Sequence, residues 1–167
     1  VGTVSMAWRG PAYSDAATWQ KLALLHNYLT DSAASPLAKA FVECASPLCG
    51  DVSATHEVFV EGYHQLWFED AEVETIDQIA PSLFRHLVAA RDDFSMERMG
   101  LCIRRMRRTH LSSVERHPTD TLIDGLTRHF LYYPTEDDQA AGGLAECCDP
   151  LAQLPSLEAM SRADWQA

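Results

Sequence analysis

The hydrophobic pattern at the start of the chain has the period of a β-strand. Residues 3–9 alternate between apolar and polar side chains, and the apolar face carries Val4, Met6 and Trp8. Successive side chains of a strand point to opposite faces, so this pattern predicts a half-buried strand. Gly10-Pro11 is a turn signal that ends it.

Residues 15–30 change to a helical period. Apolar side chains recur at helical spacing there, at Trp19, Leu22, Leu25 and Leu29. The run stops at Thr30-Asp31-Ser32 and restarts at Ser35-Pro36. Serine is favoured as an N-cap, and proline is tolerated at the first helical position because its missing N–H has no helical partner there. We therefore expect two helices separated by a capped break.

Residues 50–69 return to strand character. Apolar side chains fall in phase at Val52, Ala54, Val58 and Val60. Gly62 then marks either a hairpin bend or a bulge before a second strand. A strand pair is predicted.

The rest of the chain is predicted to be helical. Ile76 and Ile79 fit a short turn, and Pro81 is expected to begin a fresh helix. An apolar stripe then follows with a spacing of 3, 4 and 3 residues, at Met96, Met99, Ile103 and Met106. After His117-Pro118 a further amphipathic helix carries Leu122, Leu126 and Phe130. Near the end, Ser161 and Asp164 resemble a capping box.

These elements indicate an α+β fold, an antiparallel sheet covered on one face by several helices. We expect one such domain over residues 1–133, an acidic flexible loop over 134–149, and the start of a further helical segment over 150–167. The chain opens without methionine and ends six residues after the Ser161 cap. It is therefore expected to be a truncated piece of a longer protein, with a fold that is incomplete.

Composition excludes several classes of protein. Hydrophobic residues make up 47% of the 167 residues, which argues against disorder. No apolar run approaches the roughly 18 residues of a membrane span. A net charge of −11 argues against a nucleic-acid partner, because phosphate binding needs a basic face. The chain has five cysteines, no C-x-x-C pair and no secretory signal, which favours an intracellular location. The cytoplasm is the simplest choice, and an organelle stays an alternative.

Arginines on the predicted helix around residues 98–108 are the local exception to this acidity. Arg104, Arg105, Arg107 and Arg108 lie opposite the apolar stripe. Such a patch is either a solvated helix face or a docking site for a partner, and the sequence leaves both open. These four arginines are the candidate docking residues.

No catalytic, metal-binding or cofactor-binding residue can be assigned. Neither H-E-x-x-H nor H-x-x-E-H occurs, and His56 and His64 share a strand face only if Gly62 leaves the strand unbroken. Cys44 and Cys49 flank a Ser-Pro turn, and Cys147-Cys148 is read as a loop feature. A grouping of His26, Asp31 and Ser32 is better explained as cap and turn chemistry.

Several strings resemble a known family. G-T-V-S-M-A-W-R-G-P, Y-L-T-D-S-A-A-S-P-L-A-K-A-F-V-E and P-L-C-G-D-V-S are similar to the pitrilysin / insulin-degrading-enzyme superfamily of zinc metallopeptidases, or inverzincins. They look most like its large eukaryotic, uncharacterised or presequence-protease-like branch. M-E-R-M-G-L-C-I-R-R-M-R-R and H-P-T-D-T-L-I-D-G-L-T-R-H-F-L-Y-Y resemble that branch's helical region.

The resemblance implies a non-catalytic internal domain. In the family, four homologous domains enclose a peptide-degrading chamber, and zinc is held by H-x-x-E-H in the first of them. This chain lacks that motif, so it is expected to be inactive alone, with zinc in the catalytic domain of the parent protein. Where some members offer a substrate-binding tyrosine, Leu48-Cys49 stands here. The implied partners are other domains or subunits of the peptidase and peptide substrates, without nucleic acid or membrane.

Two other functions remain open from the sequence. One is a catalytically silent interaction subunit of the same fold, with the Arg98–Arg108 helix as its docking face. The other is an independent thiol or metal enzyme that uses Cys44, Cys49 and His56, which predicts stoichiometric zinc in the purified chain.

Overall fold

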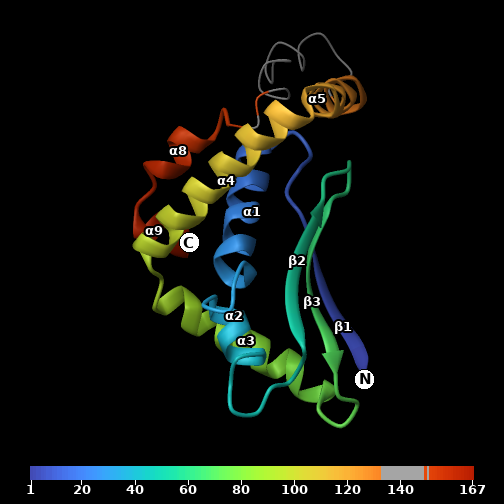
Figure 1. The fold of residues 1–167 in the computed structure, drawn as a ribbon, viewed down its shortest axis with the longest axis vertical. Helices are drawn as coiled ribbons and strands as arrows, with labels where there is room; N and C mark the ends of the chain where they lie inside the picture. Colours follow the sequence, from blue (N-terminus) through green and yellow to red (C-terminus); the bar gives the residue numbers. More distant parts are fainter. Residues whose placement is uncertain (133–148, 150) are drawn as a thin grey trace.

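The computed structural model describes residues 1–132, 149 and 151–167. The segment predicted as an acidic loop lies outside this part of the chain except for Asp149, and so do Cys147 and Cys148. Three strands form an antiparallel sheet in the order β1-β3-β2 (Figure 1). They are β1 (Gly2–Arg9), β2 (Asp51–Glu57) and β3 (Tyr63–Ala71).

The helices lie along one face of this sheet (Figure 1). Their bounds are α1 (Ala16–Thr30), α2 (Pro36–Phe41), α3 (Ile76–Asp92), α4 (Met96–Arg116), α5 (Pro118–Tyr132), α8 (Leu154–Glu158) and α9 (Arg162–Gln166). The predicted α+β fold class is confirmed. Among the described residues, the structure contains no helix with the length and apolarity needed to span a membrane.

The predicted hairpin is formed by β2 and β3, but its first strand is shorter than expected. β2 ends at Glu57, and Val60 is 67% exposed in the connecting loop. The loop folds back under the Trp19 indole. A Cβ added to Gly62 would lie only 2.6 Å from that ring and 2.7 Å from the Glu57 carbonyl oxygen. Glycine is therefore required at this close approach.

The helix break between residues 30 and 36 is confirmed, with one correction. α1 ends at Thr30, and α2 begins at Pro36 with Ser35 in the N-cap position. However, the Ser35 hydroxyl accepts no hydrogen bond from α2. It accepts instead from the backbone N–H of Ser32, over 2.9 Å. The predicted cap thus closes the turn before the helix.

One other helix prediction was wrong in part, and the predicted helix after His117-Pro118 is confirmed as α5. α3 is continuous from Ile76, with Pro81 inside it rather than at a new start. Pro81 is the sixth residue, so the missing N–H removes only one bond, to the first-turn carbonyl of Asp77. In α5 the predicted apolar stripe faces outward, since Leu122 is 51% and Phe130 71% exposed.

Two clusters of buried side chains hold the elements together. One lies between the sheet and helices α2 and α3, and includes Leu37, Phe41, Val52, Leu66, Phe68, Ile79 and Leu83. The other joins α1 and α4 to the C-terminal segment, and includes Leu24, Tyr28, Met99, Ile103, Met106, Leu154, Leu157 and Trp165. Most of the predicted α4 stripe is therefore core, although Met96 at its start is exposed. The predicted capping box of Ser161 and Asp164 is confirmed.

Candidate functional site

Three histidines meet between α1 and the sheet. His56 of β2 and His64 of β3 are directly opposite each other in the strand register. Cross-strand partners share a face, so the hairpin brings the pair together although the strand is broken between them. His26 of α1 covers both, with ring-centroid distances of 5.9 Å to His56 and 5.4 Å to His64.

Two tryptophans close this histidine cluster, which consists of His26, His56 and His64. Trp8 stacks on His64 at 5.5 Å, and Trp19 stacks on His56 at 5.8 Å, both between ring centroids. His26 Nε2 and His64 Nδ1 are hydrogen-bonded over 3.3 Å, with the donor set by the tautomers. Sequence reasoning missed the cluster because strand pairing, and not sequence spacing, creates it.

The cluster disfavours positive charge. Burial lowers the pKa of His26 to about 4, and the neighbouring His64 and His56 rings add to this effect. Burial also lowers the pKa of His64, again helped by His56. The buried imidazole of His26 is therefore neutral at pH 7, because burial and both neighbouring rings disfavour its charged form.

A reciprocal pair of caps joins α1 to α4. The backbone N–H of Ser95, the N-cap of α4, donates to the Tyr28 hydroxyl over 2.9 Å. In return, Arg98 Nε of α4 donates to the Tyr28 carbonyl over 3.0 Å, near the end of α1. The same guanidinium donates to the Ala34 carbonyl and to the Ser35 hydroxyl. Arg98 therefore holds the helix break in place.

The four candidate docking arginines point in different directions around α4. Arg105 forms an ion pair with Asp31 of α1, and Arg107 forms one with Glu158 of α8 over 2.8 Å. Arg104 lines a shallow hollow beside Leu157 and Trp165. Arg108 lines a groove on the side of α4 next to α1. Their role in docking stays a prediction.

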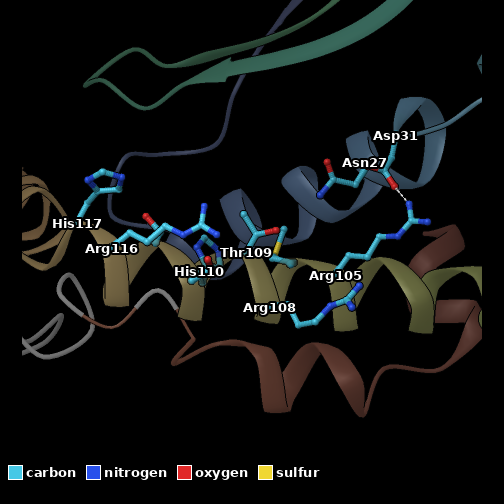
Figure 2. A pocket seen from close by; sticks show the side chains of 11 residues that line it. Asn27, Asp31, Arg105, Arg108, Thr109, His110, Arg116 and His117 are labelled. Carbon is cyan, nitrogen blue, oxygen red and sulfur yellow. Dashed lines mark hydrogen bonds and ion pairs between the residues drawn. The ribbon is translucent and has the colours of Figure 1, made fainter.

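A groove of about 920 Å³ runs between α1 and the second half of α4 (Figure 2). Its polar lining includes Asn27, Asp31, Arg105, Arg108, His110 and Arg116. Asp31 already accepts a hydrogen bond from Arg105, as the dashed line in Figure 2 marks. Arg108 and Arg116 form no ion pair with any residue that the structure describes. The groove therefore carries excess positive charge on an acidic chain.

Comparison with known proteins matches the chain to parts of much longer proteins. No model of a known protein family matches the chain. It is 31% identical over 164 residues to an uncharacterized protein of Schizosaccharomyces pombe, covering 98% of this chain and 15% of that protein. A second uncharacterized protein, from Caenorhabditis elegans, is 31% identical over 143 residues, 83% of this chain and 14% of its own length. The chain thus spans about a seventh of these curated relatives.

Solved structures decide the fold. A proposed zinc protease from Bordetella pertussis superposes with a TM-score of 0.71 at 16% identity, over 98% of this chain and 83% of its own. The inactive peptidase domain of a proposed zinc protease from Bordetella parapertussis gives a TM-score of 0.66 at 18% identity, over 99% and 82%. The chain has the fold of a zinc-protease domain. The resemblance noted in the sequence is confirmed at this level.

The zinc-protease-like domain does not assemble a metal centre from its described residues. No group of three His, Cys, Asp or Glu side chains among them is placed to hold a metal ion. In the histidine cluster, His26 and His64 direct ring nitrogens at each other rather than at a shared position. The arrangement is a packed layer and lacks the convergent ligands of a zinc site.

The other grouping considered in the sequence is not formed in the zinc-protease-like domain. His26 faces the sheet, whereas Asp31 faces Arg105 and the Ser32 hydroxyl lies 3.3 Å from that of Ser35. Asp31 is the C-cap of α1, as its interpretation as a cap residue requires. No Ser/His/Asp relay therefore exists among these residues.

The described cysteines of the zinc-protease-like domain do not suit thiol catalysis. Cys44, Cys49 and Cys102 are free thiols. The Cys44 thiol donates to the Ser46 carbonyl, and burial raises the pKa of Cys49 to about 11. A thiol with a raised pKa carries little of the thiolate that acts as nucleophile or metal ligand.

Proposed function

We propose that the chain is a non-catalytic domain of a zinc metalloendopeptidase, forming part of its peptide-binding chamber while another domain carries out proteolysis. The observation that carries this proposal is the bare face of the sheet. The helices cover one face only (Figure 1). The fold shared with an inactive peptidase domain supports the same role.

The bare face is suited to an extended peptide. It presents exposed Ser5 and Thr55 and partly exposed Gln65 and Trp67. The Thr55 hydroxyl accepts from Trp67 Nε1 over 3.2 Å and from Gln65 Nε2 over 3.1 Å, which fixes the indole as an apolar platform. β1 and β2 are edge strands among the described residues. Their free backbone groups could pair with a peptide that adds as a further strand.

The chemistry would be divided between domains. Zinc in the catalytic domain would polarise the scissile carbonyl and activate water. The residues of this chain would bind and orient the peptide, and other domains or subunits of the peptidase would be their partners. The net charge of −11 favours basic peptides, since a negative lining raises their local concentration.

The test uses peptide hydrolysis by the full-length protein that contains the chain. Trp67→Ala is expected to raise KM several-fold with kcat nearly unchanged, because Trp67 would bind substrate away from the reacting bond. Phe84→Ala is the matched control, since Phe84 is an aromatic residue that is 55% exposed on α3. Equal effects of the two variants, or hydrolysis that does not depend on zinc, would refute the proposal.

A second candidate is a catalytically silent subunit that docks through the Arg98–Arg108 helix. It is favoured by the exposure of Arg104 and Arg108, which form no ion pair with the described residues. Arg98 is not available for docking, because its guanidinium is bonded to the helix break. Glutamate at Arg104, Arg105, Arg107 and Arg108 should abolish partner binding if this function holds, and unchanged binding would exclude it.

A further inference from the structure

We infer that the groove between α1 and α4 is a docking site for an acidic peptide segment of a separate polypeptide, recognised by Arg108 and Arg116. The groove lies on the helical side of the domain, away from the bare sheet face (Figures 1 and 2). The inference therefore stands independently of the chamber proposal.

The charges in the groove favour carboxylates. Arg105 is occupied by Asp31, which leaves the guanidinium groups of Arg108 and Arg116 without an acidic partner among the described residues. Both are exposed, and an arginine fork matches a carboxylate in two parallel hydrogen bonds. Asp120 of α5 lies 3.9 Å from His117 Nδ1, at one end of the groove.

The length of the groove fits a short peptide. Its α4 side runs from Arg105 to His117, the C-cap of the helix, an interval of twelve residue steps. At 1.5 Å per residue this is about 18 Å, the span of roughly five or six extended residues. Thr109 and Ser112 lie between the arginines and offer hydroxyl groups for hydrogen bonds to a peptide backbone.

The groove suits a peptide better than the other anions. A nucleic acid would extend its phosphates over the surrounding surface, which belongs to a chain with a net charge of −11. A single small anion would leave most of the 920 Å³ unfilled. A few carboxylates on a short peptide engage the arginines without meeting that repulsion.

The experiment measures the binding of a fluorescein-labelled hexaglutamate peptide to the 167-residue chain by fluorescence anisotropy. We expect saturable binding that weakens as salt is added, because salt screens the charges. The double variant Arg108→Glu with Arg116→Glu should weaken binding at least about tenfold, since charge-assisted hydrogen bonds are lost and repulsion is added.

The matched control is the double variant Arg9→Glu with Arg85→Glu, which makes the same charge change outside the groove. Its affinity should stay within about twofold of the parent chain, because distant exposed charges are screened. Circular dichroism and thermal unfolding of both variants separate lost binding from lost folding. The milder pair Arg108→Gln with Arg116→Gln repeats the test if the glutamate variant unfolds.

Four outcomes would overturn the inference. They are no binding by the folded chain, equal losses in both double variants, and displacement of the peptide by inorganic phosphate at comparable concentration, which would assign a small-anion site. The fourth is a gain in affinity when Glu136, Asp137 and Asp138 are replaced by glutamine and asparagine. That gain would assign the groove to an acidic run of the chain itself.

Discussion

The inner face of the sheet is filled in two different ways along its length. At one end, Phe68 and Val52 pack against Phe41 and Leu83 in a buried apolar cluster. At the other end, the same strands place His56 and His64 under the indole rings and His26. The first end is stabilised by apolar burial, which does not depend on pH. The second contains His26 and His64, whose pKa values are lowered by burial, so one layer combines two kinds of stability.

The largest effect is expected at the apolar end. Phe68→Ala should lower the free energy of unfolding by about 3–5 kcal/mol, because it leaves a cavity at a side chain that is 0% exposed. Urea unfolding at pH 7 measures this. Phe84→Ala, on the solvent side of α3, should cost far less and serves as the control. Equal losses would mean that the apolar end is not the core of the domain.

Acidification should act on the histidine end. The pKa of His26 is lowered to about 4 in the fold, from 6.5 when unfolded. The unfolded chain therefore binds a proton at pH values where the folded chain does not. The stability due to the neutral ring is present above pH 6.5 and is lost as the pH falls towards 4, by about 3 kcal/mol. The lowered pKa of His64 acts in the same direction.

His26→Phe sharpens this prediction. It should reduce the loss of stability between pH 6.5 and 4 without abolishing it, because the His26 ring is gone while His64, His86 and His110 keep their lowered pKa values. Phe68→Ala should keep the full slope. Urea midpoints taken across this pH range in both variants measure the difference. A slope in His26→Phe as steep as that of the parent chain would assign the acid sensitivity to other groups.

The smallest of these effects is expected at the reciprocal caps, which are polar but do not titrate in this range. Arg98→Met should lower the free energy of unfolding by about 2 kcal/mol, since it removes charge-assisted bonds to two carbonyls that water can partly replace. The loss should be the same at pH 5 and pH 7, unlike that at the histidine end. Arg85→Met, on an exposed part of α3, is the control.

Sequence patterns located elements well wherever local chemistry decides them. β1, the break after Thr30 and the capping box at Ser161 were predictable because period and capping depend on neighbouring residues. The outward face of α5 was not, since periodicity marks a stripe without saying which side meets the rest of the molecule. Pro81 was misjudged because α3 continues through it despite the helical hydrogen bond that the proline removes.

The candidate sites depended on longer-range pairing. The histidine cluster requires the register that sets His56 opposite His64, and no spacing rule contains that register. The arginines were visible in the sequence, but their division between Asp31, Glu158 and the open groove depends on where α1 and α8 pack. The sequence does not distinguish Arg98 from the other arginines of the helix, whereas in the structure it donates to the carbonyls of Tyr28 and Ala34.

The reciprocal caps also bear on the order in which parts of the chain fold. The amide of Ser95 reaches the Tyr28 hydroxyl across 67 residues, and Arg98 reaches the Tyr28 carbonyl across 70. Closing a loop of that size costs entropy before any contact compensates for it, and distant contacts slow folding. We therefore expect the first turn of α4 to be completed late, after α1 has formed. We expect this closure to give a slow final phase in refolding kinetics. If the apolar faces of α1 and α4 dock first, Arg98→Met should leave the rate of that phase almost unchanged.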